Sequence, residues 1–170
     1  MTLCHKAFAF HWVGFASQLK PLLEQALVTS DPMPLQMFLL ANQIHCRDPY
    51  EGKPLDETSW KALENLGVQT WADFALTVFY DPVADFGLQE KWLHLEGQLP
   101  APARQALLGC IVGPASSPFD PGLMGSYFQT PDMVDQSLEI LQKFRNPELK
   151  PFLEFLKSLS LTRCGMYVTF

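Results

Sequence analysis

The chain has 170 residues, of which 48% are hydrophobic and 18% charged, and its formal net charge is −6. This length suits about one domain and lets the chain bury a core without disulfides or metals. The twelve basic residues are scattered, which excludes the clustered Lys and Arg of a surface that binds nucleic acid or anionic membrane. A basic protein partner is compatible with the acidic charge.

Export and membrane signals are not recognised in the sequence. The first six residues lack the basic and apolar regions of a signal peptide, and the longest apolar stretch, around 37–41, is far shorter than a membrane span. We therefore expect a cytoplasmic protein without a membrane partner. The four cysteines are widely spaced, and in that compartment they are expected to stay reduced.

The first 30 residues predict a strand and then a helix. Residues 4–12 are rich in aromatic side chains that partly alternate, which indicates a strand with Phe8 and Phe10 on one face. Apolar residues between 15 and 27 recur at three- and four-residue steps, as in an amphipathic helix. Pro21 either lies close to the start of this helix or kinks it.

Capping residues predict three more helices before residue 81, with a loop at 47–55. Asp or Thr begins each of them, because these side chains accept hydrogen bonds from the first backbone N–H groups. The expected helices are 31–46 with Asp31 as cap and Pro32 behind it, 56–67 with Asp56 as cap and a left-handed Gly67 at its end, and 70–80 with Thr70 as cap.

The second half predicts further helices around a long irregular stretch. Residues 109–123 hold three Gly, three Pro and two Ser, which is typical of a loop. The other expected elements are helices at 87–98 and 100–108, a strand at 124–128, helices beginning at Thr130 and Asn146, and a strand at 165–170.

These elements predict an α+β fold, because the strands do not alternate regularly with helices. Strands near both ends of the sequence and one at 124–128 would form a small sheet covered by helices. We expect the two terminal strands to be neighbours. No linker is long or polar enough for a domain boundary, so a mostly helical single domain is predicted for 1–170.

Metal and cofactor sites are not expected. The pairs Cys4-His5 and His45-Cys46 offer ligand types that zinc prefers, but adjacent residues cannot both turn toward one ion. Two acidic loops, at 48–51 and 81–85, lack the spacing of a calcium-binding loop and are interpreted as solvated caps. No cofactor fingerprint is present.

The segment 109–128 is the most distinctive part of the sequence, because long loops in compact domains are often functional. Cys110, Asp120 and Tyr127 are the candidate ligand-binding residues there, together with Tyr80 and Asp81. Cys110 is also the best-placed cysteine for a nucleophile. The alternative, which we favour from composition, is an Ω-type loop packed by its own aromatic side chains.

From about residue 85 onward the chain resembles the YfbM-like family of uncharacterised bacterial proteins. The matching features are Trp92-x-His94-Leu95, Leu107-Leu108-Gly109, Tyr127-Phe128-x-Thr130-Pro131 at a helix start, and a last helix leading into the strand 166–170. The resemblance implies a compact α+β domain and assigns no activity to any residue.

Two functional hypotheses follow. The first is a non-enzymatic binding or interaction protein of a bacterial cytoplasm, with an immunity-type protein that neutralises a basic toxin as one form. It depends on the lack of a coherent catalytic constellation. The alternative is an enzyme or a small-molecule-binding protein with a pocket beside 109–128. Neither hypothesis fixes the oligomeric state.

Overall fold

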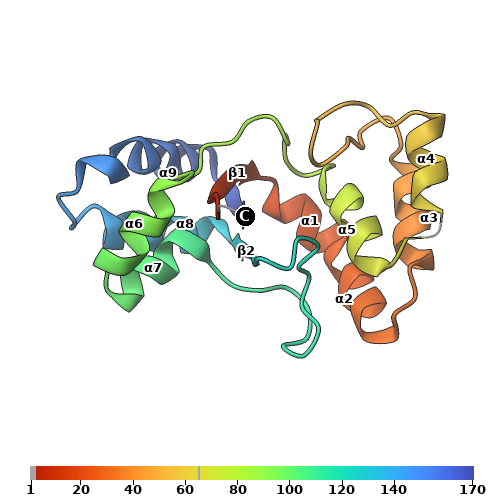
Figure 1. Ribbon diagram of the computed structural model, residues 1–170, viewed down its shortest axis with the longest axis horizontal. Helices are drawn as coiled ribbons and strands as arrows, with labels where there is room; N and C mark the ends of the chain where they lie inside the picture. Colours follow the sequence, from red (N-terminus) through yellow and green to blue (C-terminus); the bar gives the residue numbers. More distant parts are fainter. Residues whose placement is uncertain (1–2, 65) are drawn as a thin grey trace. The chain divides into compact units, whose positions relative to one another are not determined.

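The computed structural model describes residues 3–64 and 66–170, and within them the chain forms nine α-helices and three strands. It folds as two compact units (Figure 1). Unit 1 contains the residues up to Trp12, Ala84–Cys110 and Met124–Phe170; unit 2 contains Val13–Val83 and Ile111–Leu123. The predicted mostly helical α+β class is confirmed. The prediction of one domain over residues 1–170 stays a prediction.

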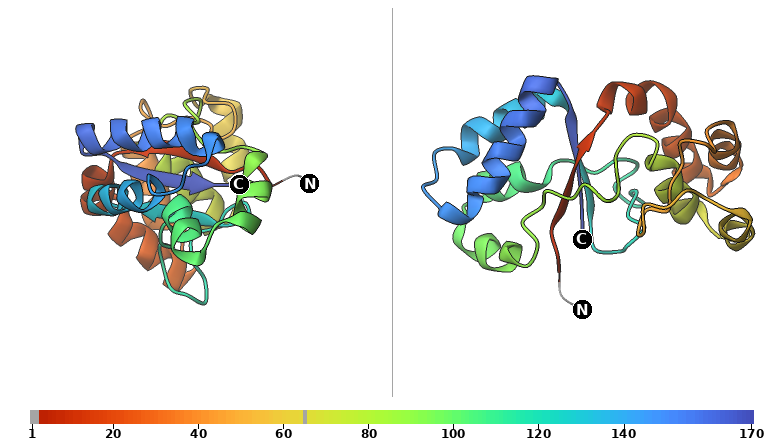
Figure 2. Two further views of the ribbon diagram at one scale, coloured as in Figure 1. Left: turned by 90° about the vertical axis from the view of Figure 1, so that its left-hand side faces the viewer. Right: turned by 90° about the horizontal axis from the view of Figure 1, so that it is seen from above.

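The sheet belongs to unit 1 and has the order β1-β3-β2, with both pairs antiparallel (Figure 2). Thr169 near the end of β3 lies opposite Lys6 on one side and Ser126 on the other. The predicted neighbourhood of the two terminal strands is therefore confirmed, and the last strand is the middle one. The strands are β1 (Lys6–Phe10), β2 (Ser126–Gln129) and β3 (Gly165–Thr169).

The two faces of the sheet carry different side chains, because successive residues of a strand point to opposite sides. Ala7, Met166 and Val168 face a buried cluster supplied by the helices of unit 1. The other face carries aromatic rings, such as those of Phe128 and Tyr167, whose centroids are 5.0 Å apart. The helices are α6 (Lys91–Gln98), α7 (Ala101–Leu108), α8 (Pro131–Leu141), the 3₁₀ turn η1 (Pro147–Leu149) and α9 (Lys150–Thr162).

The segment before α6 covers the start of β1. The Phe86 N–H donates to the carbonyl oxygen of Ala7 at 2.8 Å, and His5 and Gln89 form an antiparallel bridge. The His5 ring is fully buried: its Nδ1 accepts from the Leu88 N–H at 3.1 Å, and its Nε2 lies 2.9 Å from the carbonyl oxygen of Leu107. Burial lowers the pKa of His5, so the ring is neutral and holds this edge by two hydrogen bonds.

Unit 2 is helical. Helix α3 packs against α2 on one side and α5 on the other. The apolar stripe predicted between residues 15 and 27 is divided between two helices, with Pro21 in the first turn of the second, where a missing N–H costs nothing. The helices are α1 (Trp12–Gln18), whose first residue closes a segment of unit 1, α2 (Lys20–Thr29), α3 (Met33–Ala41), α4 (Glu57–Leu63) and α5 (Val68–Leu76).

Several helix boundaries in unit 2 differ from the prediction: α4 ends at Leu63 instead of Gly67, and α5 ends at Leu76 instead of Tyr80. Helix α3 ends at Ala41 instead of Cys46, because Asn42 leaves the helical conformation and the chain turns. Gly67 has φ −81° and ψ 178°, an extended conformation that precedes α5. Gly67 therefore begins the next helix rather than ending the previous one in a left-handed conformation, and Thr70 lies inside α5. Among the described residues, no helix combines the length and apolar character needed to cross a membrane.

Candidate functional site

The five residues predicted from the sequence are divided between the two units. Cys110 and Tyr127 belong to unit 1, where Cys110 is exposed and Tyr127 is half-buried on β2. The backbone of Cys110 pairs with Phe128 through hydrogen bonds of 2.9 and 2.8 Å, so Cys110 lies beside the strand that carries Tyr127. The structure thus brings the backbones of these two residues together.

The other three predicted residues belong to unit 2. Asp81 is exposed and its Oδ1 accepts from the Val83 N–H at 3.1 Å, as a turn-capping carboxylate does. Asp120 is half-buried, and its backbone N–H donates to Oε1 of Gln69 at 2.8 Å. Tyr80 is half-buried. None of the five lines the two hollows described below, and their role in ligand binding stays a prediction.

Helix α3 presents apolar side chains on two faces. Leu35, Phe38 and Leu39 are buried and fix the helix in unit 2. A second set continues past the end of the helix and is 56–73% exposed. Helical spacing places its three members on α3 in one line on the surface, and the fourth lies in the turn that follows the helix. This outer stripe consists of Met33, Met37, Leu40 and Ile44.

A hollow of about 500 Å³ lies on the α2 side of the outer stripe. Met33 and Met37 of the stripe form part of its wall, and Asp31 supplies a carboxylate that also accepts from the Met33 N–H at 3.0 Å. Its remaining lining residues are Leu22, Gln25, Pro34 and Phe38. Apolar lining with a single carboxylate suits an apolar segment that carries a positive charge.

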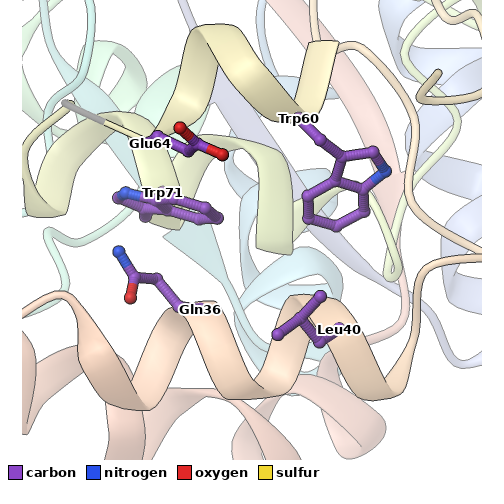
Figure 3. A pocket seen from close by; sticks show the side chains of 5 residues that line it. All are labelled: Gln36, Leu40, Trp60, Glu64 and Trp71. Atoms are coloured by element: carbon purple, nitrogen blue, oxygen red, sulfur yellow. The ribbon is translucent and has the colours of Figure 1, made fainter. Parts of the chain in front are cut away.

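A second hollow, of about 380 Å³, lies on the other side of α3 and is lined by two tryptophans, a leucine, an amide and a carboxylate (Figure 3). We call it the tryptophan pocket; its residues are Gln36, Leu40, Trp60, Glu64 and Trp71. Figure 3 shows the Glu64 carboxylate above the Trp71 ring, with Trp60 across the hollow. Leu40 belongs to both the pocket and the outer stripe, so the two surfaces are continuous.

Local sequence explains how the pocket is built. The Asp56 side chain accepts from the Ser59 N–H at 2.8 Å and caps α4, as predicted. Trp60 lies on α4, and Glu64 directly follows the last residue of that helix. The two are four residues apart, so their side chains lie on the same side. Trp71 enters from α5 and is only 5% exposed, and its Nε1 has no hydrogen-bond partner among the described residues.

Negative charge is concentrated in the unit that carries these surfaces. Unit 2 holds ten of the eighteen acidic residues but four of the twelve basic ones, so its formal net charge is −6, whereas the eight acidic and eight basic residues of unit 1 cancel. Within the described part of the chain, no Lys or Arg forms an ion pair with Glu64. The Glu64 carboxylate is thus open to a cation from outside.

One acidic group of unit 2 is buried. Asp73 on α5 is 6% exposed, and burial raises the pKa of its carboxyl to about 7, with the nearby Asp48 adding to the rise. The Tyr50 hydroxyl donates a hydrogen bond to it, which acts in the opposite direction on the pKa of Asp73. Asp73 therefore changes charge near neutral pH and connects α5 to the loop after α3.

The outer stripe and the tryptophan pocket were not predicted from the sequence. A signal for the stripe existed, because 33, 37, 40 and 44 follow helical spacing on a helix that already had a buried face. The pocket had a weaker signal, since its residues come from two pairs with helical spacing, Gln36 with Leu40 and Trp60 with Glu64, and from Trp71, and nothing in the sequence joins these three parts. Which helix faces meet depends on tertiary packing, and spacing alone does not give it.

Among residues 3–64 and 66–170, no group of three or more His, Cys, Asp or Glu side chains could hold a metal ion. In the comparisons with known proteins, no family model, no curated protein and no solved structure matches this chain.

Proposed function

We propose that this protein is a non-enzymatic interaction protein that binds a basic segment of another protein on the outer surface of α3. The observation that carries the proposal is the exposed apolar outer stripe in the unit that holds all of the net negative charge. A cytoplasmic, bacterial setting and an immunity-type role against a basic toxin belong to the same proposal.

The stripe has the character of a docking surface. Contiguous exposed apolar side chains are uncommon on a surface that contacts only water, and they mark sites of association. Met33 and Met37 add flexible, polarisable side chains that adapt to a partner. The four positions of the stripe have the sequence spacing at which one amphipathic helix contacts the apolar face of another.

Charge selects the partner. Asp31 stands at the hollow on one side of the stripe and Glu64 at the pocket on the other. A partner segment with an apolar face and flanking Lys or Arg would satisfy both sets of contacts. Complementary charge would also raise the association rate, and this contribution weakens as salt increases.

Site-specific photo-crosslinking in the host cell tests the proposal. A photoreactive amino acid replaces Met37 in one strain and Leu161, an 85% exposed residue of unit 1, in the control strain. We expect a basic protein to be captured from position 37 and not from position 161. Capture of the same proteins from both positions, or of an acidic protein from position 37, would overturn the proposal.

Affinity measurements with the captured, purified partner complete the test. Met37→Lys removes an apolar contact and adds a repulsive charge, so we expect at least a tenfold weaker Kd, roughly 1.4 kcal/mol. Met37→Gln should give a smaller loss, and Leu161→Lys should leave the Kd unchanged. Equal affinity for Met37→Lys and the parent protein would contradict binding at the stripe.

A further inference from the structure

Trp60 and Glu64 of the tryptophan pocket form a pair that suits a planar cation. Trp60 belongs to α4 and Glu64 directly follows that helix, four residues after Trp60; Trp60 is only half-buried, so part of its indole ring is open to a ligand. Figure 3 shows the Glu64 carboxylate and the Trp60 ring on opposite sides of the hollow, with Trp71 beneath Glu64 and Leu40 below Trp60. A ligand in the hollow would contact an aromatic ring and a carboxylate at once.

We infer that the tryptophan pocket receives the guanidinium group of an arginine on the partner. The inference rests on the proposed function, because it names the anchor residue of the same partner. Leu40 continues from the outer stripe into the pocket, so a segment that lies on the stripe can place one side chain in the hollow.

The chemistry favours guanidinium over ammonium. A guanidinium group is planar, stacks on an indole ring and donates two parallel hydrogen bonds to one carboxylate. It also loses less hydration than the compact ammonium of lysine when it enters an aromatic site. Figure 3 shows the Gln36 amide at the wall of the pocket with its nitrogen toward Trp71; rotation of this amide would offer its oxygen as a further acceptor for a group with five N–H donors.

Small-molecule titration tests the pocket without the partner. Nα-acetyl-arginine methylamide is titrated into the full-length protein while the indole N–H signals are followed by NMR, alongside the lysine analogue and the citrulline analogue. Citrulline keeps the shape of arginine and removes the charge. We expect millimolar binding of the arginine analogue, at least threefold weaker binding of the lysine analogue, and no saturable binding of the citrulline analogue.

Variants locate the binding. Glu64→Gln should weaken the affinity for the arginine analogue at least fivefold, and Trp60→Leu should abolish binding of this analogue. Glu57→Gln on the same helix removes an equal charge outside the pocket and should leave the affinity within twofold. Trp60→Phe, which keeps an aromatic ring, should retain measurable binding, and circular dichroism of each variant confirms that the helices are intact.

The outcomes separate this inference from the proposed function. Equal binding of the arginine and citrulline analogues, or equal effects of Glu57→Gln and Glu64→Gln, would overturn the guanidinium site. Equal affinity for the lysine analogue would overturn the choice of arginine. If only the proposal of docking at the outer stripe is wrong, Met37→Lys will leave the affinity for the partner unchanged, while the protein will still bind the arginine analogue. Capture of the partner from position 37, without binding of the arginine analogue, would support docking at the outer stripe and overturn the guanidinium site.

Discussion

At the scale of single residues, Asp73 stands out because a buried carboxyl reverses the usual effect of pH on stability. Its pKa in the folded state is about 7, against 3.8 for an ordinary Asp. The folded state therefore holds a proton that the unfolded chain releases between these two values. This contribution to stability is fully present below about pH 4 and is lost as the pH rises through about 7.

Asp73→Asn should remove this loss, because the amide is neutral at every pH and can still accept from the Tyr50 hydroxyl. We expect the variant to gain free energy of unfolding relative to the parent protein as the pH rises from 4 to 8. Urea unfolding at several pH values measures the difference. Asp81→Asn, at an exposed carboxylate, serves as the control. A difference between Asp73→Asn and parent that stays constant with pH would contradict the assignment.

At the scale of elements, the cover over the start of β1 depends on Gly87. A Cβ on this residue would meet the backbone of His5 and Lys6, so the segment before α6 can lie against the strand only without a side chain there. Gly97 in α6 is the opposite case, because a Cβ at that position would have open space around it.

Gly87→Ala should therefore destabilise the protein by about 2 kcal/mol or more, since backbone atoms must move. Gly97→Ala should stabilise it by roughly 0.5–1 kcal/mol, because alanine is the better helix former. Thermal unfolding of the two variants gives both values. Similar unfolding temperatures for Gly87→Ala and the parent would mean that β1 is not covered in this way.

Elements with a local signal were predictable from the sequence. Asp56, Thr130 and Asn146 each accept a backbone N–H at the start of the expected helix or turn, because capping depends on neighbouring residues alone. The three strands were also found from their apolar pattern. Gly67 was misplaced because a glycine between two helices satisfies the end signal of one and the start signal of the other.

The candidate site was less predictable. The sequence pattern favoured a site in the longest loop, around Cys110 and Asp120, because loops carry function more often than helices do. The helix that carries the outer stripe has more apolar residues than its one buried face contains. Nothing in the sequence pairs Trp71 with Trp60.

At the scale of the whole molecule, the chain interleaves its two units. It passes between them four times, after residues 12, 83, 110 and 123. When a chain passes several times between two units, the units tend to unfold together. Unfolding one unit releases the chain ends that it held in place for the segments of the other. This argument supports the prediction of a single domain.

Tyr167→Ala tests that prediction. Tyr167 on the middle strand is 1% exposed, and its ring stacks on Phe8 and Phe128, so we expect a loss of about 3–5 kcal/mol. Hydrogen exchange read by mass spectrometry should show reduced protection in both units. Protection lost only in unit 1 would mean two domains. Leu161→Ala, at an 85% exposed side chain, should change neither unit.

The central position of β3 has a consequence for folding during translation. β1 emerges from the ribosome early, but its sheet partner is the last of the three strands to be made. At 5–20 residues per second, Phe8 and Phe10 would wait on the order of ten seconds for it. A nascent chain thus exposes an aromatic strand until β3 is made, and binding of a ribosome-associated chaperone to that strand would shield it until the sheet can close.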